Sequence, residues 1–147
     1  MLDSVRIIVA DPQPEMQRFY REMLPQMGHR VVGVVETGRE LVQQCRAFRP
    51  DLVISDARLL DMDAVAAGEQ ILQDAAIPMI VLTARHPELL GGHWARWSMV
   101  TYLIKPVSRA RLAEEIPLAI RRFEACGGMP GRGSRVGELQ QDDISQP

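Results

Sequence analysis

Short apolar runs alternate along this chain with longer stretches in which apolar side chains recur every three or four positions. The apolar runs span residues 5–10, 30–35, 52–55, 79–82 and 101–104. Runs this short, flanked by helical patterns, are typical of strands buried in a parallel sheet. The pattern therefore predicts a series of strands joined by helical connections.

The longer stretches predict helices over residues 14–27, 39–48, 64–73 and 109–123. The first carries Tyr20 on its apolar face, and Thr37 is placed to cap the second. Pro25 is expected to end or fray the first helix, and Pro117 to interrupt the last. Residues 87–99 are expected to form one more helix, although Gly91 and Gly92 weaken that pattern.

This alternation predicts an α/β fold. Each parallel crossover places a helix on one face of the sheet, so the units form a flavodoxin-like, doubly wound (βα)5 sandwich. The expected parallel five-stranded sheet has the order 2-1-3-4-5. In this order the first and third strands are neighbours, so Asp11 and Asp56, which follow those strands, meet at one edge of the sheet.

The composition suits one compact domain. The chain has 147 residues, 46% of them hydrophobic, and a net charge of −2. We expect the domain over residues 1–126 and a flexible tail or linker over 127–147, where glycine, proline and polar residues replace the apolar pattern. The small net charge argues against a surface for nucleic acid or for an acidic membrane.

Two further features point to a soluble cytoplasmic protein. No apolar run approaches the ~20 residues of a membrane helix, and Asp3 and Arg6 interrupt the run that a signal peptide needs. The two cysteines cannot form a disulfide framework, and Cys45 lies on an apolar helix face. We therefore expect no membrane contact.

Polar residues follow four of the predicted strands. Asp11, Asp56, Thr83 and Lys105 each follow a different apolar run, and ligands gather at the carboxyl ends of parallel strands. A carboxylate at such a place can attack a phosphoryl group. That chemistry also needs a divalent cation held by oxygen ligands and a side-chain cation that pairs with the phosphoryl charge. These residues therefore predict a phosphoryl-accepting site.

The order and spacing of these residues resemble the receiver domain of two-component response regulators. Asp56 follows Asp11 by 45 positions, Thr83 follows Asp56 by 27, and Lys105 follows Thr83 by 22. The local sequences that match are residues 8–11 with Pro14 beyond them, residues 50–56, residues 80–84 and residues 102–106. The resemblance covers about residues 4 to 125.

The resemblance implies a role for each of these residues. Asp56 is the expected phosphoacceptor, and a histidine kinase or a phosphotransfer protein is the expected donor. Thr83 would supply the switch hydroxyl, and Ala84 would leave the space that phosphate needs. Lys105 would pair with the phosphate, and Tyr102 would be the aromatic rotamer switch.

The resemblance also implies a metal ion and a structural proline. Mg²⁺ is the expected cofactor, with Asp11, Asp56 and the backbone carbonyl of Arg58 as its ligands. Pro106 would be structural, because the Lys–Pro peptide at this place is usually cis in the family. The domain is expected not to be an enzyme, beyond self-catalysed phosphorylation and dephosphorylation.

The chain departs from the family at one metal position. The family's second acidic residue falls at position 12, where this chain has Pro12. Proline has neither a side-chain oxygen nor an N–H, and magnesium sites of this kind depend on few carboxylates. We therefore expect weakened Mg²⁺ binding. Arg58 brings a guanidinium close to Asp56, where it would alter the phosphorylation rates or replace part of the metal's charge.

Two hypotheses follow. In the first, the chain is a working receiver with unusual metal affinity, which Asp56, Thr83 and Lys105 favour. In the second, it is a degenerate pseudo-receiver that acts as a phosphorylation-independent protein-interaction module, which Pro12 favours.

Other phosphate-handling classes fit less well. A haloacid-dehalogenase-type phosphatase needs a second aspartate two positions after its nucleophile, where Arg58 stands. P-loop, dinucleotide-binding and FMN-binding proteins need a loop rich in glycine or hydroxyl groups after the first strand. Residues 11–14 read Asp-Pro-Gln-Pro instead.

A stand-alone receiver would signal through the face formed by the predicted fourth helix, fifth strand and fifth helix. The candidate residues on this output face are Arg85, Trp94, Trp97, Tyr102 and Arg109. A homodimer through this face is a further hypothesis. Residues 59–67 and 116–120 resemble, more loosely, regulators with an ANTAR RNA-binding domain, but neither that segment nor a DNA-binding helix-turn-helix is expected here.

Overall fold

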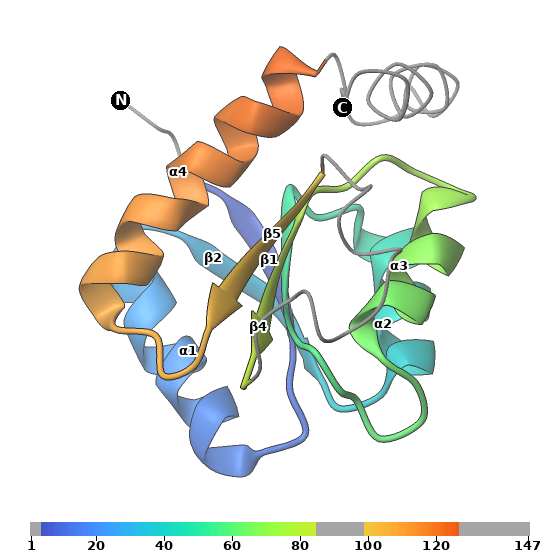
Figure 1. Ribbon diagram of the computed structural model, residues 1–147, viewed down its shortest axis with the longest axis horizontal. Coiled ribbons are helices and arrows are strands. Elements are labelled where there is room, and N and C mark those ends of the chain that lie inside the picture. The colour runs from blue at the N-terminus through green and yellow to red at the C-terminus, as the bar shows by residue number, and fades with distance from the viewer. Residues whose placement is uncertain (1–3, 85–98, 127–147) are drawn as a thin grey trace.

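The computed structural model describes residues 4–84 and 99–126 (Figure 1). In chain order, the elements are β1 (Arg6–Ala10), α1 (Pro14–Gln26), β2 (Arg30–Val35), α2 (Gly38–Phe48), β3 (Leu52–Asp56), α3 (Ala64–Leu72), β4 (Met79–Thr83), β5 (Val100–Ile104) and α4 (Arg109–Ala125). These bounds agree with the predicted elements to within a few residues.

The strands form one five-stranded sheet in the order β2-β1-β3-β4-β5. Every neighbouring pair is parallel. The order confirms the flavodoxin-like, doubly wound fold expected from the alternation of strands and helices. It also makes β1 and β3 direct neighbours, so the residues that follow these two strands lie close together.

Helices cover both faces of the sheet. α1 and α4 pack on one face, and α2 and α3 pack on the other (Figure 1). Successive residues of a strand divide between the faces: Ile7 and Val9 belong to the core under α1 and α4, whereas Ile8 and Ala10 belong to the core under α2 and α3. Because side chains alternate across a strand and both faces are covered, the strands read as continuous apolar runs.

Hydroxyl and carboxylate side chains cap three of the helices. Thr37 Oγ1 accepts from the Glu40 N–H at 3.0 Å, and the Glu40 carboxylate accepts from the Thr37 N–H at 3.3 Å. This capping box confirms Thr37 as the start of α2. Asp63 and Ser108 accept in the same way from the first turns of α3 and α4.

The prolines disturb the helices less than the sequence suggests. α4 is continuous with Pro117 inside it, so the expected interruption is wrong. Pro117 removes one backbone donor, but Ile116 and Ala119 beside it are buried and hold the helix on the sheet. Pro25 lies in the last turn of α1, which ends at the next residue.

Several expectations fall outside the described residues. They concern most of the helix predicted over residues 87–99, the tail over 127–147, and Arg85, Trp94 and Trp97 on the output face. Within the described ranges, no helix is long and apolar enough to cross a membrane. Cys45 is buried and is not in a disulfide bond, as its place on the α2 apolar face predicted.

Candidate functional site

The strand-end residues gather at one edge of the sheet. The residues that lie opposite each other at this edge are Ala10 and Ser55, Asp56 and Leu82, and Thr83 and Ile104. Asp11 and Lys105 directly follow the last paired residues of β1 and β5. The parallel register therefore collects the residues that the sequence predicted to share a site, although they come from four different strands.

An ion pair joins the end of β5 to the end of β3. Lys105 Nζ contacts Asp56 Oδ1, and the two side chains are 27% and 16% exposed. The Lys105 N–H also donates to the Thr83 carbonyl at 2.8 Å, which fixes the backbone from which the lysine reaches across. The Lys105–Pro106 peptide is cis, as the family resemblance implied.

Asp11 is the buried acid of the site, with no exposed surface. Its Oδ1 accepts from the Gln13 N–H at 2.9 Å, whereas its Oδ2 has no hydrogen-bond partner. Burial raises the pKa of Asp11. The Gln13 N–H opposes this shift, the negative charge of Asp56 adds to it, and Lys105 opposes it. The charges of Asp56 and Lys105 therefore reach Asp11, and the three residues form one electrostatic unit.

Hydrogen bonds hold the loop after Asp56 at two places. The Arg58 N–H donates to Asp56 Oδ2 at 3.2 Å, and the Arg58 side chain is exposed to solvent. Asp61 accepts from the N–H groups of Gly38 and Arg39, at 2.6 and 3.1 Å, at the start of α2. The loop that follows Asp56 is thus tied to a helix N-terminus, where a carboxylate is favoured.

The remaining predicted residues surround this centre. Thr83 is buried at the end of β4, and Ala84 after it is exposed. Tyr102 on β5 is half-buried against the core under α2 and α3, and burial raises the pKa of its hydroxyl. Arg109 is exposed at the first residue of α4. Their positions are compatible with the predicted roles, which stay predictions.

The oxygen donors at this edge fit a largely hydrated Mg²⁺ ion. Asp11 Oδ2 is a buried carboxylate oxygen without a partner, and the Asp56 carboxylate lies within its electrostatic reach. Pro12 contributes no side-chain oxygen. No group of three or more His, Cys, Asp or Glu side chains in the described part of the chain is placed to hold a metal. These two carboxylates suit Mg²⁺, which keeps several waters and needs few protein ligands. The Arg58 carbonyl as a third ligand stays a prediction.

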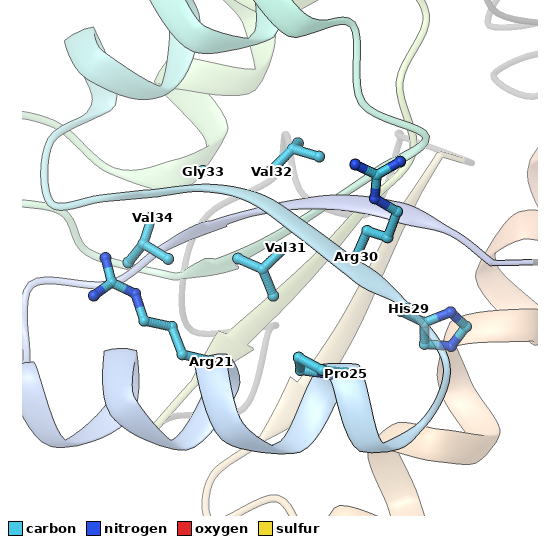
Figure 2. Close-up of a pocket in the computed structure, with 8 residues that line it drawn as sticks. All are labelled: Arg21, Pro25, His29, Arg30, Val31, Val32, Gly33 and Val34. Atoms are coloured by element: carbon cyan, nitrogen blue, oxygen red, sulfur yellow. The ribbon is translucent and has the colours of Figure 1, made fainter.

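A separate hollow of about 540 Å³ runs along the edge strand β2. Figure 2 shows its lining, which consists of Arg21, Pro25, His29, Arg30 and residues 31–34. None of the predicted site residues borders it. His29 Nδ1 accepts from the Val5 N–H at 3.2 Å, so this histidine has a structural hydrogen bond there.

The structure gives two further residues a place that the sequence did not predict: Tyr20 near the charges of the site and Asp61 at the start of α2. Tyr20 is buried on α1, as its apolar face predicted. Burial raises the pKa of its hydroxyl, and the negative charges of Asp11 and Asp56 raise it further. In the sequence, the feature that could have singled out Tyr20 is its hydroxyl, which stands on an otherwise apolar helix face. Asp61 gave no signal, because its partners on α2 become neighbours only in the fold.

The comparisons with known proteins agree with this geometry. The family model described as the response regulator receiver domain matches residues 7–117. The transcriptional regulatory protein PdtaR of Mycobacterium tuberculosis is 29% identical over 90% of this chain, and the match spans 65% of its own length. Protein PilH of Pseudomonas aeruginosa is 31% identical over 76% of this chain and 93% of PilH.

Solved structures give the same result. The signal receiver domain of a modulated diguanylate cyclase from Desulfovibrio desulfuricans superposes with a TM-score of 0.73 and 25% identity, over 84% of this chain and 98% of that one. The response regulator PhyR from Brucella abortus superposes with a TM-score of 0.71 and 27% identity, over 83% of this chain and 50% of PhyR. Both superpositions cover most of the chain.

The raised pKa of Asp11 predicts how stability responds to pH. A carboxyl group whose folded pKa lies above the ordinary value of 3.8 makes the folded state less stable as pH rises through that folded pKa. Asp11→Asn removes this ionisation and keeps an oxygen for the Gln13 N–H. The free energy of unfolding of the variant, relative to wild type, is therefore expected to increase from pH 3.5 to pH 7.

Urea denaturation in magnesium-free buffer at a series of pH values measures this difference. Asp74→Asn is a suitable control, because Asp74 is an exposed carboxylate that pairs with Arg46 outside the site. A difference between Asp11→Asn and wild type that stays constant across the pH range would contradict the raised pKa.

Proposed function

This chain belongs to the response regulator receiver domain family, and we propose that it accepts a phosphoryl group on Asp56 from a histidine kinase or a phosphotransfer protein. The observation that carries the proposal is the grouping of Asp56, its ion-pair partner Lys105 and the buried Asp11 at one sheet edge. Receiver domains act in signalling without being enzymes in their own right. The proposed domain spans residues 1–126, with 127–147 as a tail or linker.

In the proposed reaction, one Asp56 oxygen forms a bond to phosphorus while the bond from phosphorus to the donor nitrogen or oxygen breaks. The departing electron pair stays on the donor, and the product is an acyl phosphate. Asp56 loses its carboxylate charge, and the negative charge of the site moves to the phosphoryl oxygens. Lys105, which is paired with Asp56 before the reaction, then pairs with a phosphoryl oxygen. The Thr83 hydroxyl donates to another phosphoryl oxygen.

Asp11, Asp56 and the Arg58 carbonyl would hold Mg²⁺, which neutralises the charge of the phosphoryl oxygens when it is bound. Asp11 has a free carboxylate oxygen for this purpose. Pro12 removes the second acid from the same side, so we propose that this chain binds Mg²⁺ more weakly than a receiver with two acids there. Ala84 leaves room for phosphate, and Tyr102 changes rotamer as Thr83 moves.

The proposed output is carried by the face around β5 and α4, where Tyr102 and Arg109 lie. PdtaR is longer than its match to this chain, so the output of the whole protein is part of the proposal. A homodimer through this face is part of the proposal, whereas binding of nucleic acid by this domain is not.

A pseudo-receiver is the alternative function, and Pro12 is the observation that favours it. With a weakened metal side, the Lys105–Asp56 ion pair would persist and the domain would bind its partner without phosphorylation. The two functions differ in whether Asp56 gains a phosphoryl group.

Incubation with acetyl phosphate and Mg²⁺ tests the proposed phosphorylation. Wild type is expected to gain the mass of one phosphoryl group in intact-mass spectrometry, and Asp56→Asn is expected to gain none, because its amide is not a nucleophile toward phosphorus. Asp74→Asn, a matched change of an exposed aspartate, should be modified like wild type. No adduct on wild type across a wide range of Mg²⁺ concentration would favour the pseudo-receiver.

Restoring an acid at position 12 tests the weakened metal side. Pro12→Asp is expected to tighten Mg²⁺ binding by about tenfold, since even groups that only orient a metal ligand contribute ~10–100-fold to affinity. Pro12→Ala is the matched control, because it removes the proline ring and adds no carboxylate. Isothermal titration calorimetry measures both variants. Equal Mg²⁺ affinities for Pro12→Asp and Pro12→Ala would show that the missing acid does not limit metal binding.

A further inference from the structure

Two buried side-chain oxygens, one on Asp11 in the site and one on Tyr20 of α1, have no explanation so far in the hydrogen bonding of the protein. Asp11 Oδ2 and the Tyr20 hydroxyl both lack a hydrogen-bond partner. Asp11 has no exposed surface, and Tyr20 is 1% exposed. A buried polar group without a partner is costly and rare, so each of these atoms needs a physical explanation.

The direction of helical side chains explains how Tyr20 reaches this place. Side chains on a helix lean toward its N-terminus. α1 begins at Pro14, three residues after Asp11, which directly follows β1. The Tyr20 ring shares a core cluster with Val9, Ile54 and Leu82. These strand residues lie just before the residues of the site, so the ring forms part of the layer directly beneath the pocket.

The hydroxyl at the end of this ring is within electrostatic reach of both acids. After burial, Asp11 is the next cause that raises the pKa of the Tyr20 hydroxyl, and Asp56 follows. Packing alone does not require this oxygen, because a phenylalanine ring would fill the same apolar space. The hydroxyl therefore adds a hydrogen-bond donor beneath the only acid that this chain has at positions 11 and 12.

We propose that Tyr20 is a positioning residue for Asp11, and that its hydroxyl donates through one buried water molecule to Asp11 Oδ2. The Gln13 N–H already holds Oδ1 at 2.9 Å, so the carboxylate is fixed at both oxygens. A buried water commonly joins polar groups that have no direct partner. Partners of this kind orient metal ligands, and their loss weakens metal affinity.

The consequence for Mg²⁺ rests on the proposed function, whereas the link between Tyr20 and Asp11 does not. Because Pro12 offers no carboxylate, the affinity of this side of the pocket for a cation depends on the orientation of the Asp11 carboxylate. The Asp11 carboxylate keeps a lone pair of Oδ2 for that cation while it accepts from the water.

A double-mutant cycle in magnesium-free buffer tests the link itself. Tyr20→Phe removes one oxygen and keeps the ring. It is expected to lower the urea midpoint of unfolding in the wild-type background, because Asp11 Oδ2 loses its donor. In the Asp11→Ala background the same change is expected to leave the midpoint unchanged or raise it. Additive shifts in the two backgrounds would overturn the proposal, because residues that act independently add.

Isothermal titration with Mg²⁺ tests the consequence for the metal. Tyr20→Phe is expected to weaken Mg²⁺ affinity by about tenfold. Met23→Leu, a volume-conserving change of a buried residue on the same helix face, is the control and should match wild type. An unchanged affinity in Tyr20→Phe, or an equal loss in Met23→Leu, would overturn the positioning role.

The two experiments separate this inference from the proposed function. If wild type binds no Mg²⁺ but the cycle is non-additive, the metal role of Asp11 fails and the link to Tyr20 stands. If wild type binds Mg²⁺ but the cycle is additive, the metal site stands and Tyr20 has only a packing role.

Discussion

The parallel pairing of β1, β3, β4 and β5 is the constraint on which the candidate site depends. Each of these strands carries an apolar run into the core. Each ends in a polar residue or is directly followed by one, and the register brings these residues to one edge. No single segment of the chain contains the site. A slip in register would turn buried strand residues toward the wrong face, so the packing that stabilises the sheet also fixes the distance between Asp11, Asp56 and Lys105.

The charges at this edge do not balance. Asp11 and Asp56 place two carboxylates near one ammonium group, and burial already opposes ionisation of Asp11. A bound cation would relieve both effects. The family solves this problem with two acids before the first helix, whereas this chain has Asp11 followed by Pro12. The Gln13 N–H on one oxygen of Asp11, and the proposed water from Tyr20 on the other, would make a single acid better oriented than it would be alone.

The fold and the strand-end residues could be predicted because their signals are local. Apolar runs predicted the strands, and Thr37 predicted the start of α2. The family was indicated by the spacing of Asp11, Asp56, Thr83 and Lys105. Features that arise only from tertiary packing could not be predicted. Pro117 stays inside a continuous α4 because its buried neighbours hold that helix on the sheet. Asp61 caps α2 from a distant loop, and the direction of the Tyr20 hydroxyl depends on how α1 lies against β1.

The most direct test of the phosphoacceptor site is a crystal structure grown with Mg²⁺ and beryllium fluoride, a stable mimic of a phosphoryl group. We expect a beryllium fluoride adduct on Asp56, the metal in contact with Asp11, and Lys105 paired with a fluorine instead of Asp56 Oδ1. An unmodified Asp56 still paired with Lys105, in crystals saturated with both reagents, would contradict this expectation.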